Sequence, residues 1–245
     1  MEIRVFDNAT QVGAAGAALF AAQLLKKPDS VLGLATGSSP IPTYQHLIEL
    51  YKAGAVDFSH AVSYNLDEYV GLNPDHPCSY HYFMMDQLFN HVNMRSEAIH
   101  VPCGNAADLD AGAKAYDAAI EQAGDIDMQL LGIGRNGHIG FNEPDSCFAC
   151  GTHQVTLTES TIAANTRFFE NEAQVPRQAY SMGMQAIMQA KRVLLIASGA
   201  DKAEAIRNSF FGPVTPQVPA SILQFHRDVI VIADEAALAD CPAEA

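Results

Sequence analysis

Apolar residues recur along the chain in two kinds of segment that alternate with each other. Short runs of valine, leucine and isoleucine predict strands, and longer stretches with apolar residues at helical spacing predict helices. The predicted strands are Glu2–Phe6, Val31–Leu34, Ala61–Asn65, Asp127–Ile133, Val193–Ala197 and Val229–Ala233. The predicted helices are Gln11–Lys26 with Thr10 as its cap, Ile41–Tyr51, Ser79–His91, Asp108–Gln122, Pro176–Ala190 and Asp201–Phe210.

This alternation predicts an α/β fold built around a mostly parallel sheet. No Pro/Gly/Ser-rich linker and no internal repeat interrupts it, so we expect residues 1–245 to form a single domain. Only the end of the chain, Ala233–Ala245, is expected to be weakly held. Ligands of parallel sheets bind beyond the carboxyl ends of the strands. Polar residues directly after strands are therefore the candidates for a functional site.

Composition and charge narrow the classes of partner. The 245 residues carry a net charge of −14, which repels nucleic-acid phosphates, so we expect no nucleic-acid partner. No apolar run is long enough to span a membrane and no secretory signal opens the chain, so we expect no membrane partner and a cytoplasmic location. A small phosphorylated molecule fits this charge if a few cations gather locally.

The cysteines number five, an odd count that fits a reducing compartment better than a disulfide scaffold. Cys147 and Cys150 form a CxxC pair, and His153 follows. Zinc or redox chemistry is one interpretation, but no fourth zinc ligand is evident. We favour two free thiols and expect no metal site.

Two of the loops after strands carry polar groups that could bind an anion or act as a base. The loop after Val31–Leu34 contains Thr36, Gly37, Ser38 and Ser39 and leads into a helix. Hydroxyls, backbone N–H groups and a helix N-terminus suit an anion, although simple helix capping is an equal alternative. After Ala61–Asn65 come Asp67 and Glu68, which point to opposite sides of an extended chain. One of them could act as a base, although surface charge or helix capping would also explain the pair.

The loop after the fourth strand, Gly132–Pro144, is the richest in candidate chemistry. Its glycines permit close approach to a ligand, although its lone GxGxxG match is weak evidence for a dinucleotide site. His138 lies among these glycines with Asn136 before it and Glu143 after it. A histidine held by a carboxylate and an amide is suited to move protons.

Five motifs together identify a family resemblance over about Glu2 to Ala233. LATGSSP, NLDEYVGL, LGIGRNGHIGFNEP, NTRFFEN and PASILQ occur in this order. With them the chain resembles the glucosamine-6-phosphate deaminase (isomerase) family, in its short, non-allosteric branch. The resemblance implies a modified doubly wound, Rossmann-like sheet flanked by helices. It also implies conversion of glucosamine 6-phosphate and water to fructose 6-phosphate and ammonia, with no cofactor and no metal.

The resemblance also implies a role for each candidate residue. Asp67 matches the base that moves a proton between C2 and C1, and His138 matches the residue that opens the sugar ring, with Glu143 as its partner. Asn136 matches a position that is aspartate in hexameric members. The residues that match the phosphate site are Thr36, Gly37, Ser38, Ser39, Arg167 and Lys202.

Two features separate this chain from the hexameric members. Their effector site carries basic residues, whereas Ala149–Val155 contains no arginine or lysine, and the C-terminal tail is short. We therefore expect a monomer or small homo-oligomer without allosteric activation. Arg167 lies in a polar stretch, Glu159–Pro176, in which we expect a lid.

Two other functions remain as alternatives. A 6-phosphogluconolactonase also places a histidine after a glycine loop, but its motif ends differently from Gly140–Pro144. A sugar-phosphate sensor of a transcription regulator would carry a DNA-binding helix-turn-helix, and this chain starts directly with a predicted strand. Ammonia release from glucosamine 6-phosphate separates the three functions.

Overall fold

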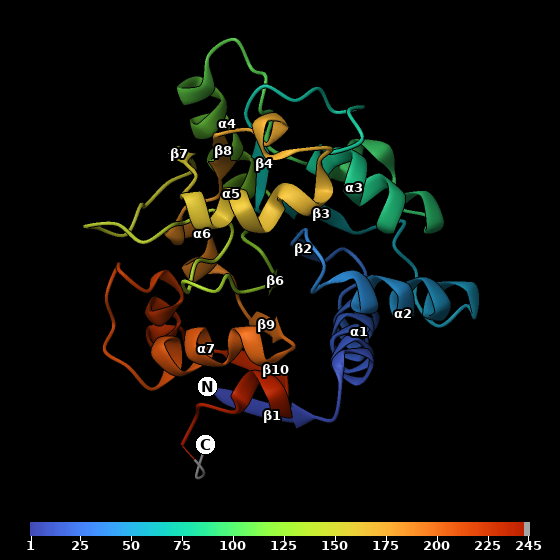
Figure 1. The fold of residues 1–245 in the computed structure, drawn as a ribbon. Helices are drawn as coiled ribbons and strands as arrows, with labels where there is room; N and C mark the ends of the chain where they lie inside the picture. The colour runs from blue at the N-terminus through green and yellow to red at the C-terminus, as the bar shows by residue number, and fades with distance from the viewer. Residues whose placement is uncertain (243–245) are drawn as a thin grey trace.

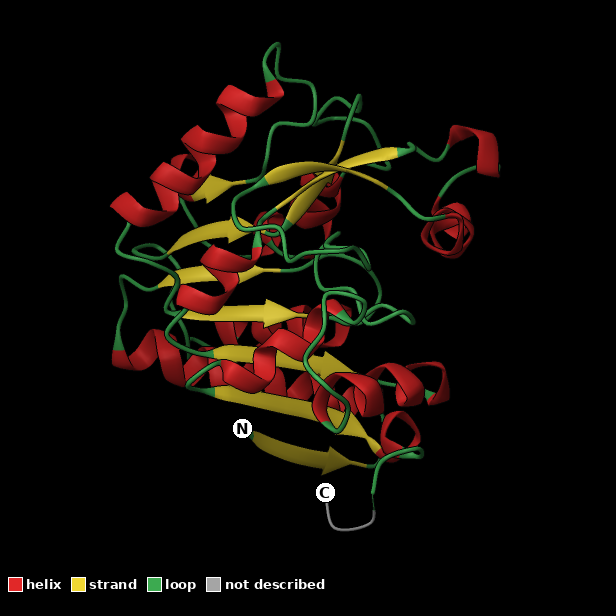
Figure 2. Cartoon of the chain, turned by 90° about the vertical axis from the view of Figure 1, so that its left-hand side faces the viewer, coloured by secondary structure: helices red, strands yellow, loops and turns green. Residues whose placement is uncertain are grey.

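Seven parallel strands form the larger of two sheets in the computed structural model, which describes residues 1–242 (Figure 1). They are β1 (Glu2–Phe6), β2 (Val31–Leu34), β3 (Val62–Asn65), β5 (Ile99–His100), β6 (Met128–Leu131), β9 (Val193–Ala197) and β10 (Val229–Asp234). Their order across the sheet is β1-β10-β9-β6-β2-β3-β5. Figure 2 shows these strands stacked edge to edge with helices on both faces. The predicted α/β, mostly parallel fold is confirmed.

Most helices of the fold follow the predicted segments, although no helix was predicted over Glu159–Asn165. The helices are α1 (Ala9–Lys26), α2 (Ile41–Lys52), α3 (Tyr80–Gln87), α4 (Leu109–Gln122), α5 (Glu159–Asn165), α6 (Met184–Gln189) and α7 (Ala203–Phe210). The predicted cap Thr10 is wrong, because the Asn8 side chain accepts the N–H of Gln11 at 3.0 Å and starts the helix two residues earlier. No helix in residues 1–242 has both the length and the apolar character needed to cross a membrane.

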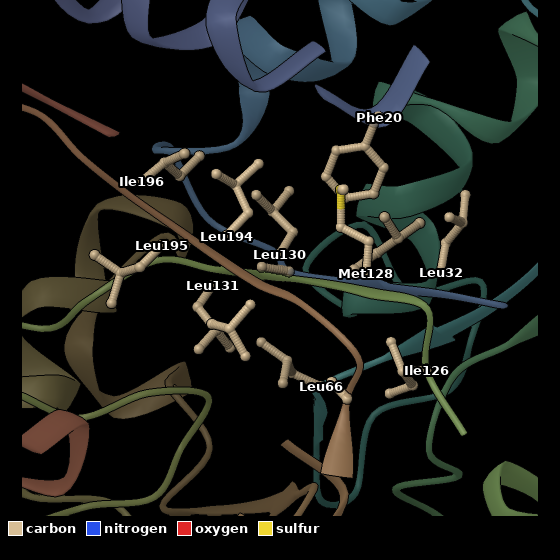
Figure 3. Packing of buried hydrophobic residues seen from close by; sticks show 14 of the residues in the cluster. Phe20, Leu32, Leu66, Ile126, Met128, Leu130, Leu131, Leu194, Leu195 and Ile196 are labelled. Atoms are coloured by element: carbon tan, nitrogen blue, oxygen red, sulfur yellow. The ribbon is translucent and has the colours of Figure 1, made fainter. Parts of the chain in front are cut away.

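The core lies on both faces of β6 and β9. All four residues of β6 and all five of β9 are buried, as is typical of a central parallel strand. Leu130 pairs with Leu194 in register, and the two side chains point to the same face (Figure 3). Phe20 from α1 covers that face, whereas Leu131 and Leu66 lie on the other. The loop that carries His138 therefore begins directly after a buried central strand, β6.

A second sheet of three antiparallel strands lies beside the first. It contains β4 (Asp67–Tyr69), β8 (Gln178–Ser181) and β7 (His153–Thr156), in that order. The prediction of one helix over Pro176–Ala190 is therefore wrong, because its first half is a strand and only Met184–Gln189 is helical. Pairing with β4 and β7 on both sides outweighs local helix propensity in β8.

The segment after β10 is held more firmly than the sequence predicts. Glu235–Leu238 forms a short 3-10 helix, and Ala237 is fully buried. The Asp234 carboxylate accepts the N–H groups of Ala237 and Gly199, each at 2.9 Å. The predicted weak tail is wrong as far as Leu238, and residues 243–245 lie outside the described part of the chain.

The strand order reverses between β2 and β6. From β2 the chain proceeds outward through β3 to β5, and then returns to place β6 on the other side of β2. Loops that leave neighbouring strands at such a point diverge and open a crevice at the carboxyl ends. The loop containing Thr36 follows β2, and the glycine loop follows β6. Only Leu66 separates β3 from β4, so Asp67 reaches the same edge.

Candidate active site

A cavity of about 600 Å³ occupies this crevice. Nine of the ten predicted site residues line it: Thr36, Gly37, Ser38, Ser39, Asp67, Asn136, His138, Arg167 and Lys202. Glu143, the tenth, lies behind Asn136 and His138 and contacts both. Residues from five separate stretches of the chain thus meet at one cavity.

The loop after β2 turns its hydroxyls toward the cavity rather than to the following helix. Pro40 occupies the N-cap position of α2, and no side-chain hydrogen bond caps the start of this helix. Helix capping therefore does not explain Ser38 and Ser39, which line the cavity. Arg167 approaches from the far side, and its Nη2 donates to Ser38 Oγ at 3.1 Å.

Positive charge gathers at the same end of the cavity. Lys202 follows β9, its side chain is only 19% exposed, and its Nζ lies 3.7 Å from Asp201 Oδ2. Burial lowers the pKa of Lys202, and the charges of Arg135 and Arg167 lower it further, against the opposing effect of Asp201. All three cations line the cavity. The arrangement suits a phosphate group.

Asp67 presents a nearly enclosed carboxyl group to the cavity. It is 5% exposed, and Thr36 Oγ1 donates to its Oδ1 at 3.4 Å. Gly140 lies so close that a Cβ on it would sit 3.5 Å from Asp67 Oδ2, in a backbone conformation (φ +58°) that side chains rarely adopt. Burial, and then the neighbouring Glu68 charge, raise the pKa of Asp67 to about 8. A carboxylate with a raised pKa is a stronger base than an exposed one.

Glu68 points away from the cavity, so the expectation that only one of the two acids faces the site is confirmed. Its carboxylate is buried and accepts the backbone N–H groups of Tyr69 at 2.8 Å and of Tyr80 and His81 at 2.9 Å. The last two bonds tie the start of α3 to β4. Tyr80 itself lines the cavity, so Glu68 positions a wall of the site.

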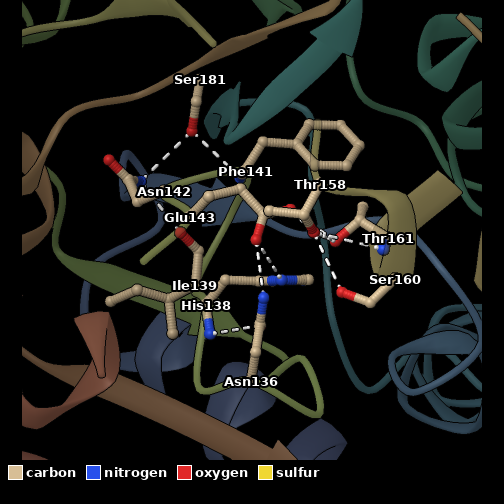
Figure 4. Close-up of polar contacts among 10 residues, drawn as sticks. All are labelled: Asn136, His138, Ile139, Phe141, Asn142, Glu143, Thr158, Ser160, Thr161 and Ser181. Carbon is tan, nitrogen blue, oxygen red and sulfur yellow. Dashed lines mark hydrogen bonds and ion pairs between the residues drawn. The ribbon is translucent and has the colours of Figure 1, made fainter. Parts of the chain in front are cut away.

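His138 fits against the backbone of its own loop. A Cβ on Gly134 would lie 2.3 Å from the imidazole ring, so only glycine permits this packing. The Nδ1 atom lies 3.5 Å from Glu143 Oε2 and has no hydrogen-bond partner among the described residues. The ring thus lies beside the Glu143 carboxylate (Figure 4), and His138 also lines the cavity.

Glu143 is the centre of a hydrogen-bond network that reaches α5. Asn136 Nδ2 donates to Oε2 at 2.7 Å, and Thr158 and Thr161 donate to Oε1. Asn136 Oδ1 accepts the backbone N–H of His138 at 3.2 Å and so completes a ring of contacts. Burial alone would raise the pKa of Glu143, but His138 and the donors Thr161 and Asn136 lower it to about 2. Glu143 is thus a permanent negative charge beside the histidine.

Several residues that shape the site were not predicted. Asn142 donates to Ser181 Oγ at 3.2 Å and to the Met182 carbonyl at 2.9 Å, which fixes the glycine loop to β8. Tyr80 stacks on Phe141, with ring centroids 5.7 Å apart. Asn142 lies within the GHIGFNEP motif and could have been named from it, but its partner on β8 could not.

The CxxC pair shows no metal or disulfide arrangement. Cys147 and Cys150 are both exposed free thiols, and Cys150 Sγ lies 3.0 Å from Gln185 Oε1. Within residues 1–242, no three His, Cys, Asp or Glu side chains gather as a metal site would require.

Comparison with known proteins identifies the class to which this fold and site belong. The chain belongs to the family of glucosamine-6-phosphate isomerases/6-phosphogluconolactonase, whose model matches residues 7–232. The resemblance inferred from the five motifs is thereby confirmed.

Two relatives that align with most of the chain carry the same name. The glucosamine-6-phosphate deaminase of Thermoanaerobacter sp. (strain X514) is 50% identical over 244 residues, which cover 100% of this chain and 96% of that protein. The glucosamine-6-phosphate deaminase of Lachnoclostridium phytofermentans is 58% identical over 214 residues, which cover 87% of this chain and 91% of that protein.

Solved structures divide into near and distant neighbours. A monomeric glucosamine-6-phosphate deaminase superposes with a TM-score of 0.96 at 43% identity, covering 98% of this chain and 100% of its own. A 6-phosphogluconolactonase from Leishmania guyanensis superposes with a TM-score of 0.75 at 19% identity, covering 99% of both chains. The second similarity concerns the fold alone.

Proposed function

We propose that this protein converts glucosamine 6-phosphate and water to fructose 6-phosphate and ammonia. The observation that carries the proposal is the placement of Asp67 and His138 on one cavity that Ser38, Arg167 and Lys202 also line. A base, a proton-transfer histidine and a phosphate cradle are what an amino-sugar phosphate requires. The names of the relatives support the same reaction.

Ring opening is the first step of the proposed reaction. His138 takes the proton from the C1 hydroxyl and delivers a proton to the ring oxygen O5, which breaks the C1–O5 bond and leaves an aldehyde. A histidine can do both because an imidazole can accept a proton and donate one. Asn136 and Glu143 position the ring, and the fixed charge of Glu143 stabilises the imidazolium that forms between the two transfers.

Isomerisation and loss of ammonia follow. The Asp67 carboxylate takes the proton from C2, the electrons form a C1–C2 double bond, and the π electrons of the C1=O bond move to O1, which takes up a proton. A proton is then returned to C1 of this enolamine while the nitrogen lone pair forms the C2=N bond. The product is the imine at C2; water adds there and ammonia leaves, which gives the ketone of fructose 6-phosphate. Each step moves a proton or adds water, which side chains can do.

All five thiols are free, which supports a reducing compartment, and we propose the cytoplasm.

The test is ammonia release from glucosamine 6-phosphate by the purified protein, compared with its Asp67→Asn variant. The amide keeps the shape of the carboxylate but cannot accept a carbon-bound proton. We expect wild-type turnover and a fall in kcat of about 100-fold or more in the variant, with KM nearly unchanged. A variant that retains a tenth of the wild-type kcat would contradict the role of Asp67.

Assays of the same purified protein with both substrates distinguish the alternative functions. Hydrolysis of 6-phosphogluconolactone without ammonia release would indicate the lactonase. Binding of the sugar phosphate with no turnover of either substrate would indicate a sensor.

A further inference from the structure

The glycine loop contains a cation that neither the proposed chemistry nor the family resemblance assigns. Arg135 lies directly before Asn136 and lines the cavity, yet its side chain is 72% exposed. Consecutive residues here serve different ends of the site. Asn136 turns inward to Glu143, whereas Arg135 turns to Asp201, on the loop after β9.

One carboxylate oxygen holds Arg135 beside Lys202. Asp201 Oδ2 lies 3.0 Å from Arg135 Nε and 3.7 Å from Lys202 Nζ. Among the described residues the only hydrogen bond of the guanidinium is the one from Nε to Asp201, so its terminal nitrogens remain available. A guanidinium with available terminal nitrogens can bind two phosphate oxygens at once.

The sheet topology places this pair next to the phosphate cradle. β6 lies between β9 and β2, so the loop that carries Arg135 leaves the sheet between the loops that carry Lys202 and Ser38. Arg135, Arg167 and Lys202 all line the same cavity. Asp201 is the acid that lies among them.

Fold stability does not explain the Arg135–Asp201 pair. Both partners are well exposed, at 72% and 44%, and exposed ion pairs contribute little to folding. Two cations held side by side in a protein of net charge −14 instead create a local anion site.

We propose that Arg135 is a third phosphate-binding cation, held in position by Asp201 and acting together with Arg167 and Lys202 on the phosphate monoester of the substrate. The inference rests on the proposed function for the identity of the sugar but not for the binding of phosphate. Arg135 contacts the phosphate end of the cavity, so its loss weakens binding and leaves the proton-transfer groups in place.

The test compares Arg135→Ala with a matched control. Arg192 forms an ion pair with Asp228 at 2.8 Å, but it precedes β9 and lies at the opposite end of that strand from Lys202. Arg192→Ala therefore removes the same charge far from the cavity. Binding of inorganic phosphate to the whole protein is measured by calorimetry at fixed ionic strength, and KM and kcat for glucosamine 6-phosphate are measured in parallel.

We expect Arg135→Ala to weaken phosphate binding and to raise KM by about tenfold or more, with kcat within about twofold of wild type. Arg135→Lys keeps the charge but loses the paired donors, so it should fall between Arg135→Ala and wild type. Arg192→Ala should match wild type in both measurements. Equal phosphate affinity and equal KM in Arg135→Ala and Arg192→Ala would overturn the inference.

The two proposals can fail separately. Wild-type protein that releases no ammonia, but whose phosphate affinity still depends on Arg135, would refute the deaminase function and leave this inference standing. Normal ammonia release with phosphate affinity indifferent to Arg135 would do the reverse.

Discussion

Asp67 lies where water barely reaches it, and this enclosure opposes folding while it serves the reaction. The pKa of Asp67 is raised by burial and by Glu68 to about 8, whereas in the unfolded chain it lies near its ordinary value of about 4. The folded state therefore favours the protonated form of Asp67 over the ionised form more strongly than the unfolded chain does. Its contribution to stability is complete below about pH 4 and is lost as the pH rises through about 8.

We expect Asp67→Asn to stabilise the fold at alkaline pH. The difference in Tm between variant and wild type should grow as the pH rises from 4.5 to 8.5 and reach about 2 °C or more at the upper end. Asp127→Asn is the opposite control, because Lys191 and Lys27 hold the pKa of that buried carboxyl low against the effect of burial. It should destabilise the protein at the same pH. A Tm difference for Asp67→Asn that stays constant over this range would contradict the raised pKa.

The pH dependence of wild-type activity should also report the titration of Asp67. A base must be ionised before it can take a proton, so kcat/KM is expected to increase with pH up to about 8 and then level off. Initial rates from pH 5.5 to 9.5 at constant ionic strength measure this profile. A profile already level at pH 6 would show that the carboxyl titrates like an exposed one.

Arg167 and Lys202 provide a further prediction for single residues. Replacing either with Ala should raise KM for the sugar phosphate by about tenfold or more, because each loses a charge-assisted contact with phosphate. Neither forms a well-buried ion pair, so Tm should change little. Steady-state kinetics and thermal melting measure the two effects, and unchanged KM in both variants would refute the assignment.

At the scale of elements, α5 and the turns after it connect the two halves of the site. Thr161 on α5 binds Glu143, and Arg167 two residues after α5 binds Ser38. Beyond Arg167, Phe168 is 42% exposed, and its carbonyl accepts from Cys78 Sγ at 3.3 Å. A segment held by a few polar contacts over a cavity is suited to act as a lid.

We therefore expect residues 159–176 to exchange amide hydrogens more slowly when glucitol 6-phosphate is bound. This sugar has no aldehyde carbon and cannot react, so the change reports binding alone. In Arg167→Ala the protection should disappear, whereas α1 should exchange at the same rate with and without the sugar. Equal exchange of residues 159–176 in both states would exclude closure of this segment.

How well each element was predicted from the sequence depends on whether its stabilising partners are local or distant in the chain. Central strands such as Val193–Ala197 were predicted to the residue, because continuous burial leaves an unmistakable apolar run. The strand Gln178–Ser181 was predicted as helix, because its conformation depends on β4 and β7, which lie far away in the sequence. The site was predicted wherever one motif holds both partners, as for Asn136 and Glu143. The bond from Asn142 to Ser181 joins a motif to a strand outside every motif and was missed.

At the scale of the whole molecule, the stretch Ala149–Val155, where the family resemblance led us to expect no effector site, offers an anion no arginine or lysine. Thr152 donates its backbone N–H to Asp117 Oδ2 at 2.9 Å, and its hydroxyl binds the other carboxylate oxygen. A carboxylate thus occupies a region that contains no arginine or lysine from Ala149 to Val155. An anionic effector requires cations, so this surface would repel it.

We expect hyperbolic kinetics and no activation by N-acetylglucosamine 6-phosphate. Cooperativity requires coupled sites and two global states, and we propose a monomer or small homo-oligomer. Initial rates with and without the effector test the first expectation, and light scattering tests the second against the chain mass of 26.3 kDa. A Hill coefficient clearly above one that falls toward one with the effector would refute this prediction.

The pairing of β1 with β10 affects how the protein is made. Among the described strands β1 pairs with β10 alone, from Glu2 opposite Ile230 to Phe6 opposite Asp234. During synthesis on the ribosome β1 therefore has no partner until nearly all of the following chain has emerged. Until then the backbone of β1 has no partner strand and its apolar side chains remain uncovered. A chain that stalls before β10 leaves this segment accessible to chaperones and proteases. Emergence of β10 thus becomes the step that closes the sheet at β1.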